Sequence, residues 1–174
     1  MHLFLVAGKA RSGKTLVANL LKKRLEENGK KVVITEYSKY VKLFAKEILG
    51  WDGVTEPKPR KFLQDMGSFV RKHYSDIYFT ERMKEDLEIY KRFVDVVIIS
   101  DVRMPKEINE LDSYKPVTIK VINNNSNYDL TDEEARHETE HALDNYANFM
   151  YILEDKSESE LESIVKKILK ERDL

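Results

Sequence analysis

The pattern that most constrains this chain is G-x-x-x-x-G-K-T, which residues 8–15 match in full as GKARSGKT. A short apolar run at residues 3–7 precedes the pattern, and apolar residues at helical spacing follow it. Strand, glycine-rich loop and helix in this order are the setting of a phosphate-binding loop (P-loop), whose backbone N–H groups bind phosphate oxygens. The residues we expect to bind ATP are Gly8, Lys9, Ala10, Arg11, Ser12, Gly13, Lys14 and Thr15.

Two side chains of this loop carry more specific expectations. We expect Lys14 to reach the outer phosphates of ATP as a catalytic residue, and the hydroxyl of Thr15 to ligate Mg2+. The alternative is an ordinary strand–loop–helix turn with no ligand.

The rest of the chain alternates between the two kinds of secondary structure. Apolar runs predict strands at 3–7, 32–34, 95–100, 117–122 and 150–153. Helical spacing and capping signals predict helices at 15–28, 37–49, 60–73, 76–92, after Pro105, from 131 to about 146, and after Ser157. The expected fold is therefore an α/β three-layer P-loop fold with a mostly parallel sheet, in a single domain spanning 1–174.

Composition and charge narrow the partners. There are no cysteines and no apolar stretch long enough to span a membrane, so we expect a soluble cytoplasmic protein without disulfides. Residues 1–122 carry 24 Lys and Arg against 17 Asp and Glu, whereas residues 123–174 carry 6 against 14. The basic first part suits a small anionic ligand, and the acidic end argues against nucleic-acid binding. Whether the chain forms a homodimer is left open.

The carboxyl ends of the predicted strands gather a second set of polar residues. In parallel sheets covered by helices, ligands bind at these ends. Ser38 and Lys42 follow the second strand, and Asp101 and Arg103 follow the strand centred on VVII. Asp101 is a candidate Mg2+ ligand and catalytic residue, with a helix cap as the alternative.

Arginines are the expected ligands of a phosphorylated acceptor, because guanidinium groups match phosphate geometry. The candidates are Arg60, Arg71, Arg103 and Arg136, and Arg103 and Arg136 are also candidate catalytic residues. For Arg60 and Arg71, surface salt bridges are the alternative role.

Four segments together resemble the deoxynucleoside monophosphate kinases of phages and bacteria. They are GKARSGKT at 8–15, RKFLQDMG at 60–67, SDVRMPKE at 100–107 and ETEHALDN at 138–145. The last segment is equally similar to animal-type phosphomevalonate kinases. The resemblance, which runs from residue 3 to about 169, implies a nucleoside monophosphate kinase fold with an acceptor-binding helical region at about 37–92 and a lid at about 123–146.

The resemblance also implies roles for individual residues. Lys14 and Thr15 would hold ATP and Mg2+, and Gln64 would join Arg60 and Arg71 in the acceptor region. Such lids supply arginines to the transferred phosphoryl group, yet between 123 and 137 the only basic residue is Arg136. The acidic residues around Arg136 are Asp129, Asp132, Glu133 and Glu134.

Residues 137–141, HETEH, match the H-E-x-x-H pattern of zinc proteases. On a helix the two histidines would lie one turn apart and could chelate zinc. No third ligand is evident, and the spacer contains a charged Glu140 where that helix is usually apolar. The lid of the kinase resemblance accounts for the same residues.

The function expected from the sequence is ATP- and Mg2+-dependent phosphorylation of a nucleoside monophosphate, with a deoxynucleotide first among the acceptors. Two alternatives stay open. One is a kinase of another phosphorylated metabolite such as phosphomevalonate, and the other is an ATP-binding sensor with low turnover. A GTPase is disfavoured, because the sequence has no Asn-Lys-x-Asp segment.

Overall fold

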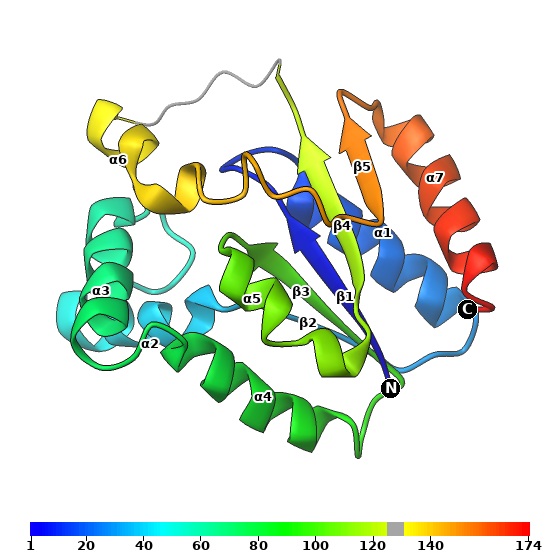
Figure 1. The fold of residues 1–174 in the computed structure, drawn as a ribbon, viewed down its shortest axis with the longest axis horizontal. Coiled ribbons are helices and arrows are strands. Elements are labelled where there is room, and N and C mark those ends of the chain that lie inside the picture. The colour runs from blue at the N-terminus through cyan, green and yellow to red at the C-terminus, as the bar shows by residue number, and fades with distance from the viewer. Residues whose placement is uncertain (125–130) are drawn as a thin grey trace.

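A computed structural model of the chain describes residues 1–124 and 131–174 (Figure 1). The strands are β1 (His2–Ala7), β2 (Val32–Thr35), β3 (Val96–Val102), β4 (Val117–Ile122) and β5 (Tyr151–Glu154). The longer helices are α1 (Lys14–Glu27), α2 (Ser38–Leu49), α3 (Arg60–His73), α4 (Tyr78–Tyr90) and α7 (Glu158–Glu171). The shorter ones are α5 (Pro105–Asn109), η1 (Asp112–Tyr114), α6 (Asp132–Arg136) and η2 (Glu138–Glu140).

The five strands form one sheet in the order β2-β3-β1-β4-β5. All four pairings are parallel, including His2 with Val96 and Phe4 with Val117. This confirms the predicted α/β class. The sequence predicted a mostly parallel sheet, and every pairing among the described residues is parallel. Neighbouring strands that are not consecutive in sequence, such as β3 and β1, bring distant segments to one edge.

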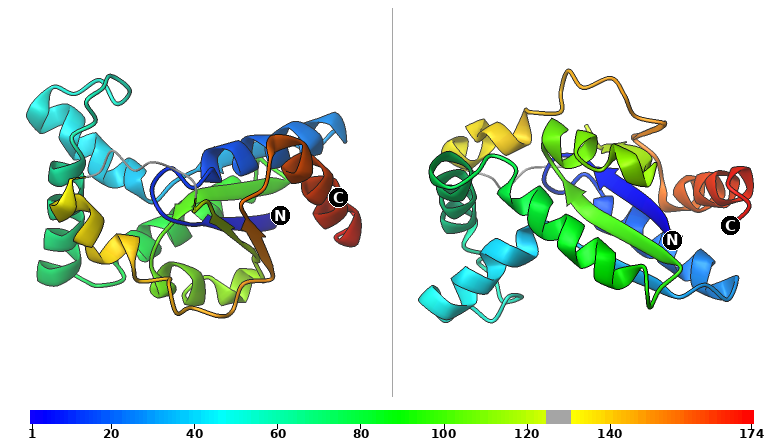
Figure 2. Two further views of the ribbon diagram at one scale, coloured as in Figure 1. Left: turned by 90° about the horizontal axis from the view of Figure 1, so that it is seen from above. Right: turned by 60° about the horizontal axis from the view of Figure 1, so that its bottom comes forward.

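Helices cover both faces of the sheet, as seen from above in Figure 2. Within β1 the side chains of Phe4 and Val6 pack with α1 and α7, whereas those of Leu3 and Leu5 pack with α2, α3, α4 and α5. Successive side chains of a strand point to opposite faces of the sheet, and both faces are covered by apolar layers. These strands therefore appear in the sequence as continuous apolar runs. The helices α2, α3 and α6 extend beyond one end of the sheet (Figure 1).

Capping explains where several helices begin and end. Thr131 and Ser157 accept from the N–H groups of Glu134 and Glu160, as the capping-box spacing predicted. Gly50 ends α2 in the left-handed conformation. Within the described residues, no helix has the length and apolar character needed to cross a bilayer.

The prediction of a helix from 131 to about 146 is wrong. The α-helix stops at Arg136, and His137 has an extended backbone with φ −62° and ψ 141°. Its ring accepts from the N–H of Thr139 and contacts Ser68 of α3, so this side chain begins a separate turn, η2. Part of the lid expected at about 123–146, including the acidic Asp129, falls within 125–130, outside the described residues.

Candidate active site

The P-loop connects β1 to α1 and holds a backbone shape that demands glycine. A Cβ on Gly8 would lie 2.4 Å from the carbonyl oxygen of Val121 and 2.5 Å from the Oγ of Ser12. Gly13 precedes α1 with φ 98°, a left-handed value that favours glycine. Among the described residues no side chain caps α1, and its first turn contains no acidic residue. An uncapped helix start behind a glycine-rich loop is a site for an anion from outside the chain.

Lys14 is buried at the base of this loop. Its Nζ donates to the main-chain carbonyl of Lys9 and lies 3.5 Å from the Oγ of Ser12. Burial first, and then the nearby charge of Arg103, lower the pKa of Lys14 to about 7, although Glu140 and Asp101 oppose the shift. The loop therefore holds a lysine whose charged form is disfavoured until an anion arrives.

Asp101 lies in β3 next to the start of α2, because β3 and β2 are neighbours in the sheet. Its two carboxylate oxygens accept from the N–H groups of Tyr37 (2.7 Å) and Ser38 (2.9 Å). Asp101 thus performs the helix-capping role that the sequence offered as an alternative. A carboxylate has roughly four acceptor positions, so this contact leaves room for a further ligand.

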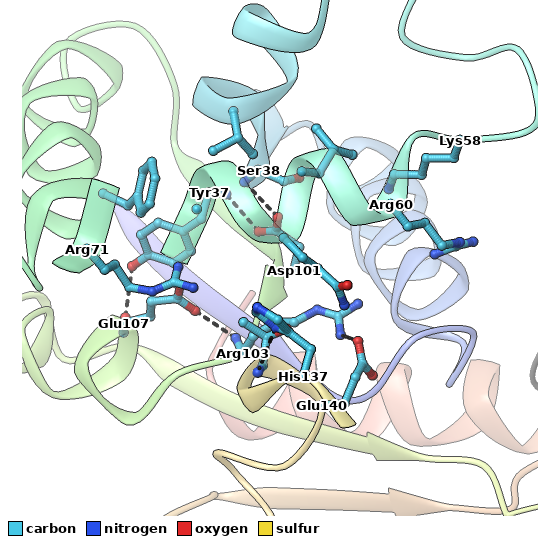
Figure 3. Close-up of a pocket in the computed structure, with 16 residues that line it drawn as sticks. Tyr37, Ser38, Lys58, Arg60, Arg71, Asp101, Arg103, Glu107, His137 and Glu140 are labelled. Carbon is cyan, nitrogen blue, oxygen red and sulfur yellow. Dashed lines mark hydrogen bonds and ion pairs between the residues drawn. The ribbon is translucent and has the colours of Figure 1, made fainter. Parts of the chain in front are cut away.

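Beside the P-loop lies a pocket of about 800 Å³, part of it open to solvent (Figure 3). It is built from the end of β3, the helices α2, α3, α4 and α5, and the 137–140 segment. Six residues predicted from the sequence line it: Ser38, Arg60, Gln64, Arg71, Asp101 and Arg103. Lys42 and Arg136 are not among the lining residues; Lys42 pairs with Glu36, and Arg136 is exposed.

Arg71 enters the pocket from α3. Its guanidinium packs over the ring of Phe79 at 5.9 Å, and its Nη2 donates to Glu138 at 3.1 Å. Its Nε is buried and has no hydrogen-bond partner among the described residues. A buried donor of this kind is costly unless a bound molecule accepts from it.

Sequence reasoning missed several lining residues. Lys58 faces the pocket from the loop before α3, and burial with the nearby Lys42 and Arg60 lowers its pKa. Glu107 is buried, and its Oε2 accepts from the N–H groups of Arg103 (2.7 Å) and Met104 (3.0 Å). Burial raises the pKa of Glu107 to about 7. Glu107 lies three residues after Met104, at the start of the short helix. This capping-box spacing is the only feature of the sequence that could have predicted its contact with the N–H of Met104.

Arg103 stands between this pocket and the P-loop. It lines the pocket, and it also lines a recess of about 1100 Å³ next to Gly8, Lys9 and Ser12. Arg103 pairs with Glu140 of η2, whose carboxylate is 7% exposed. Another recess, of about 580 Å³, lies between Gly13 and the loop that leads into α7.

The HETEH segment does not form a zinc site. His137 contacts Ser68 through Nε2 at 3.0 Å, whereas Nε2 of His141 donates to the carbonyl of Ala135 at 2.8 Å. The backbone break at His137 separates the two rings onto different turns. Among residues 1–124 and 131–174, no group of three or more metal-binding side chains is gathered.

The fold is similar to solved P-loop kinases. Shikimate kinase from Bacteroides thetaiotaomicron matches with a TM-score of 0.53 and 14% identity over 99% of both chains. Shikimate kinase from Aquifex aeolicus vf5 matches with 0.53 and 16%, over 99% of this chain and 98% of that one. An unliganded sugar kinase from Janibacter sp. HTCC2649 matches with 0.52 and 12%, over 99% and 95%. At such identities the likeness establishes the fold. No protein-family model and no curated protein matches the sequence.

Proposed function

We propose that this chain is a kinase that transfers a phosphoryl group from ATP to a phosphate group of a small acceptor, most directly a nucleoside monophosphate. The observation that carries the proposal is the position of Arg103, which lines both the P-loop recess and the neighbouring pocket. A guanidinium at that boundary can face a donor phosphate and an acceptor phosphate together.

The charge of the pocket favours an anionic acceptor. Lys58, Arg60 and Arg71 line it together with Arg103. The three lining carboxylates are already engaged. Asp101 caps α2, Glu107 accepts from the N–H groups of Arg103 and Met104, and Glu140 pairs with Arg103. The guanidinium groups of Arg60 and Arg71 are further donors in the lining. A phosphorylated molecule would supply the acceptors that these donors need.

The residues of the P-loop fit ATP, and the oxygen ligands beside it fit Mg2+. The backbone around Gly8 and the uncapped start of α1 match the needs of a polyphosphate. The hydroxyl of Thr15, in the first turn of α1, and the spare acceptor positions of Asp101 are oxygen ligands of the type Mg2+ takes. When bound, ATP supplies the phosphoryl group and Mg2+ neutralises part of its charge.

The chain's own residues would act by positioning and charge. Lys14, once in contact with an anion, regains its proton and balances negative charge on the transferred group. Arg103 would hold the two phosphates in line, and Arg60 and Arg71 would fix the acceptor. Val41, Leu63 and Phe79 supply the apolar wall against which the acceptor's body would rest.

The proposed acceptor is a nucleotide because the 60–67 and 100–107 segments, which resemble deoxynucleoside monophosphate kinases, both contribute to this pocket. A second phosphorylated acceptor, such as phosphomevalonate, has the same charge requirement and stays the main alternative. We propose a cytoplasmic address, a single domain, and no nucleic-acid partner.

A coupled ADP-release assay tests the proposal. Mg-ATP would be combined with a panel of ribo- and deoxynucleoside monophosphates, phosphomevalonate and shikimate. We expect release with a nucleoside monophosphate and none from Lys14→Ala. ADP release only with phosphomevalonate would show that phosphomevalonate, rather than a nucleotide, is the acceptor. ATP binding without ADP release for any compound would favour the ATP-binding sensor.

A further inference from the structure

Glu140 occupies an unusual position for an acidic residue. Its Oε2 accepts from the N–H of Ala10 in the P-loop at 2.9 Å, and its Oε1 pairs with Nη1 of Arg103. The carboxylate is almost completely buried, and it lines both the acceptor pocket and the P-loop recess. Figure 3 shows it facing the guanidinium of Arg103 at the edge of the pocket.

The donors that Glu140 uses are of the kind that bind phosphate. A backbone N–H of a glycine-rich loop and an arginine fork together form an anion site. Glu140 brings one negative charge to that site. It also counts among the charges that favour the protonated form of Lys14.

A second acidic contact accompanies the first. Asp144 pairs with Lys9 of the P-loop at 2.9 Å. Between these two acids, the carbonyl of Leu143 accepts from Nζ of Lys120 at 2.7 Å. The 140–144 segment therefore places two carboxylates and a carbonyl on cationic or N–H groups beside the recess in which phosphates would bind.

We propose that Glu140 competes with substrate phosphate for Arg103 and the Ala10 N–H, and so weakens phosphate binding by the empty site. A phosphate that takes these donors must displace the carboxylate, because two anions repel each other on one partly buried guanidinium. The inference rests on the proposed function only in taking the P-loop as the phosphate site. It also gives the acidic 137–144 segment a role where an arginine was expected.

A positioning role for Glu140 predicts the opposite result. If the carboxylate served to hold Arg103 ready for phosphate, its neutralisation would weaken phosphate binding or lower kcat. If it competes, neutralisation strengthens phosphate binding. Glu140→Gln separates the two, because the amide keeps the size of the side chain and an oxygen for the Ala10 N–H.

The test is calorimetric titration of sodium tripolyphosphate into wild type, Glu140→Gln and the control Glu133→Gln. Glu133 is exposed and pairs with Lys61, away from the pocket. We expect Kd to fall about two- to fivefold in Glu140→Gln, the range of one partly shielded charge pair, and to stay unchanged in the control. An unchanged or higher Kd in Glu140→Gln overturns the competition alone. No binding by any of the three proteins overturns the phosphate site as well.

A second test uses the wild-type protein, so it does not depend on whether a variant folds. With 13C-labelled glutamate carboxyl groups, the resonance of Glu140 is expected to move when tripolyphosphate saturates the protein. A resonance that stays in place at saturation would show that phosphate and Glu140 do not share donors.

Discussion

The ammonium group of Lys14 donates to the main-chain carbonyl of Lys9, inside the loop that both residues belong to. In this arrangement the lysine is buried, and its pKa is lowered to about 7, chiefly by burial and next by Arg103. The protonated form is thus only partly populated near neutral pH in the empty protein. A polyphosphate in the loop would restore the proton, because an opposite charge favours the charged form.

We expect Mg-ATP binding at about pH 8 to be accompanied by uptake of up to about one proton. The measurement is calorimetry in buffers of different ionisation enthalpy. Lys14→Met, which cannot titrate, should lose this uptake while any residual binding is recorded. Equal proton uptake by the two proteins would show that another group is responsible.

Asp101 should matter for stability as well as for the site, because it caps α2 through two backbone N–H groups. Asp101→Ala is expected to lower the free energy of unfolding by roughly 1–2 kcal/mol, as for other helix caps. Chemical denaturation measures the change. Asp65→Ala, whose carboxylate is 64% exposed and pairs with Lys61, is the control and should change stability by less than about 0.5 kcal/mol. Equal effects would refute the capping role.

Glu107 should give the protein a pH-dependent stability. Burial raises its pKa in the folded protein to about 7 from the ordinary 4.5. Between these values the folded state keeps a proton that the unfolded state releases, so this group's contribution falls as pH rises from about 4.5 to 7. The stability of wild type relative to Glu107→Gln should therefore decline over that window, by roughly 2–3 kcal/mol in total. A difference that is flat with pH would contradict the assignment.

Arg103 should be irreplaceable by lysine. An ammonium cannot present the planar fork that would contact a donor and an acceptor phosphate together. We expect Arg103→Lys to lower kcat/KM by about a hundredfold or more, as for loss of a charged transition-state contact. The control is Arg92→Lys, an exposed arginine outside the pocket, and it should behave as wild type. A wild-type kcat/KM for Arg103→Lys would show that the guanidinium of Arg103 has no role in the reaction.

The sequence predicted the part of the site that follows from strand order. Buried strands read as apolar runs, and parallel strands bring their carboxyl ends to one edge, so the P-loop, Asp101 and Arg103 could be expected together. The sequence allowed Asp101 to cap a helix but did not show which one, because the contact with Ser38 joins residues 63 apart in the chain.

Other features depend on tertiary contacts that leave no local pattern. The helix predicted beyond residue 136 is interrupted because His137 contacts Ser68 on α3. Glu140 reaches Ala10 across 130 residues, and its sequence context suggested only a charged helical position. Lys58 lies in a loop that contains prolines and has no periodic pattern, so its position in the pocket could not be predicted from the sequence.

In the proposed reaction the acceptor group is itself a phosphate, and a 31P NMR spectrum of the complete reaction mixture identifies that group. Mg-ATP would be incubated with the protein and a mixture of nucleoside monophosphates, phosphomevalonate and shikimate. Because ADP forms with any acceptor, we expect the coupled resonances of a second new diphosphate besides those of ADP, and neither set with Lys14→Ala. A new uncoupled phosphate-ester resonance would show transfer to a hydroxyl group instead, and would contradict it.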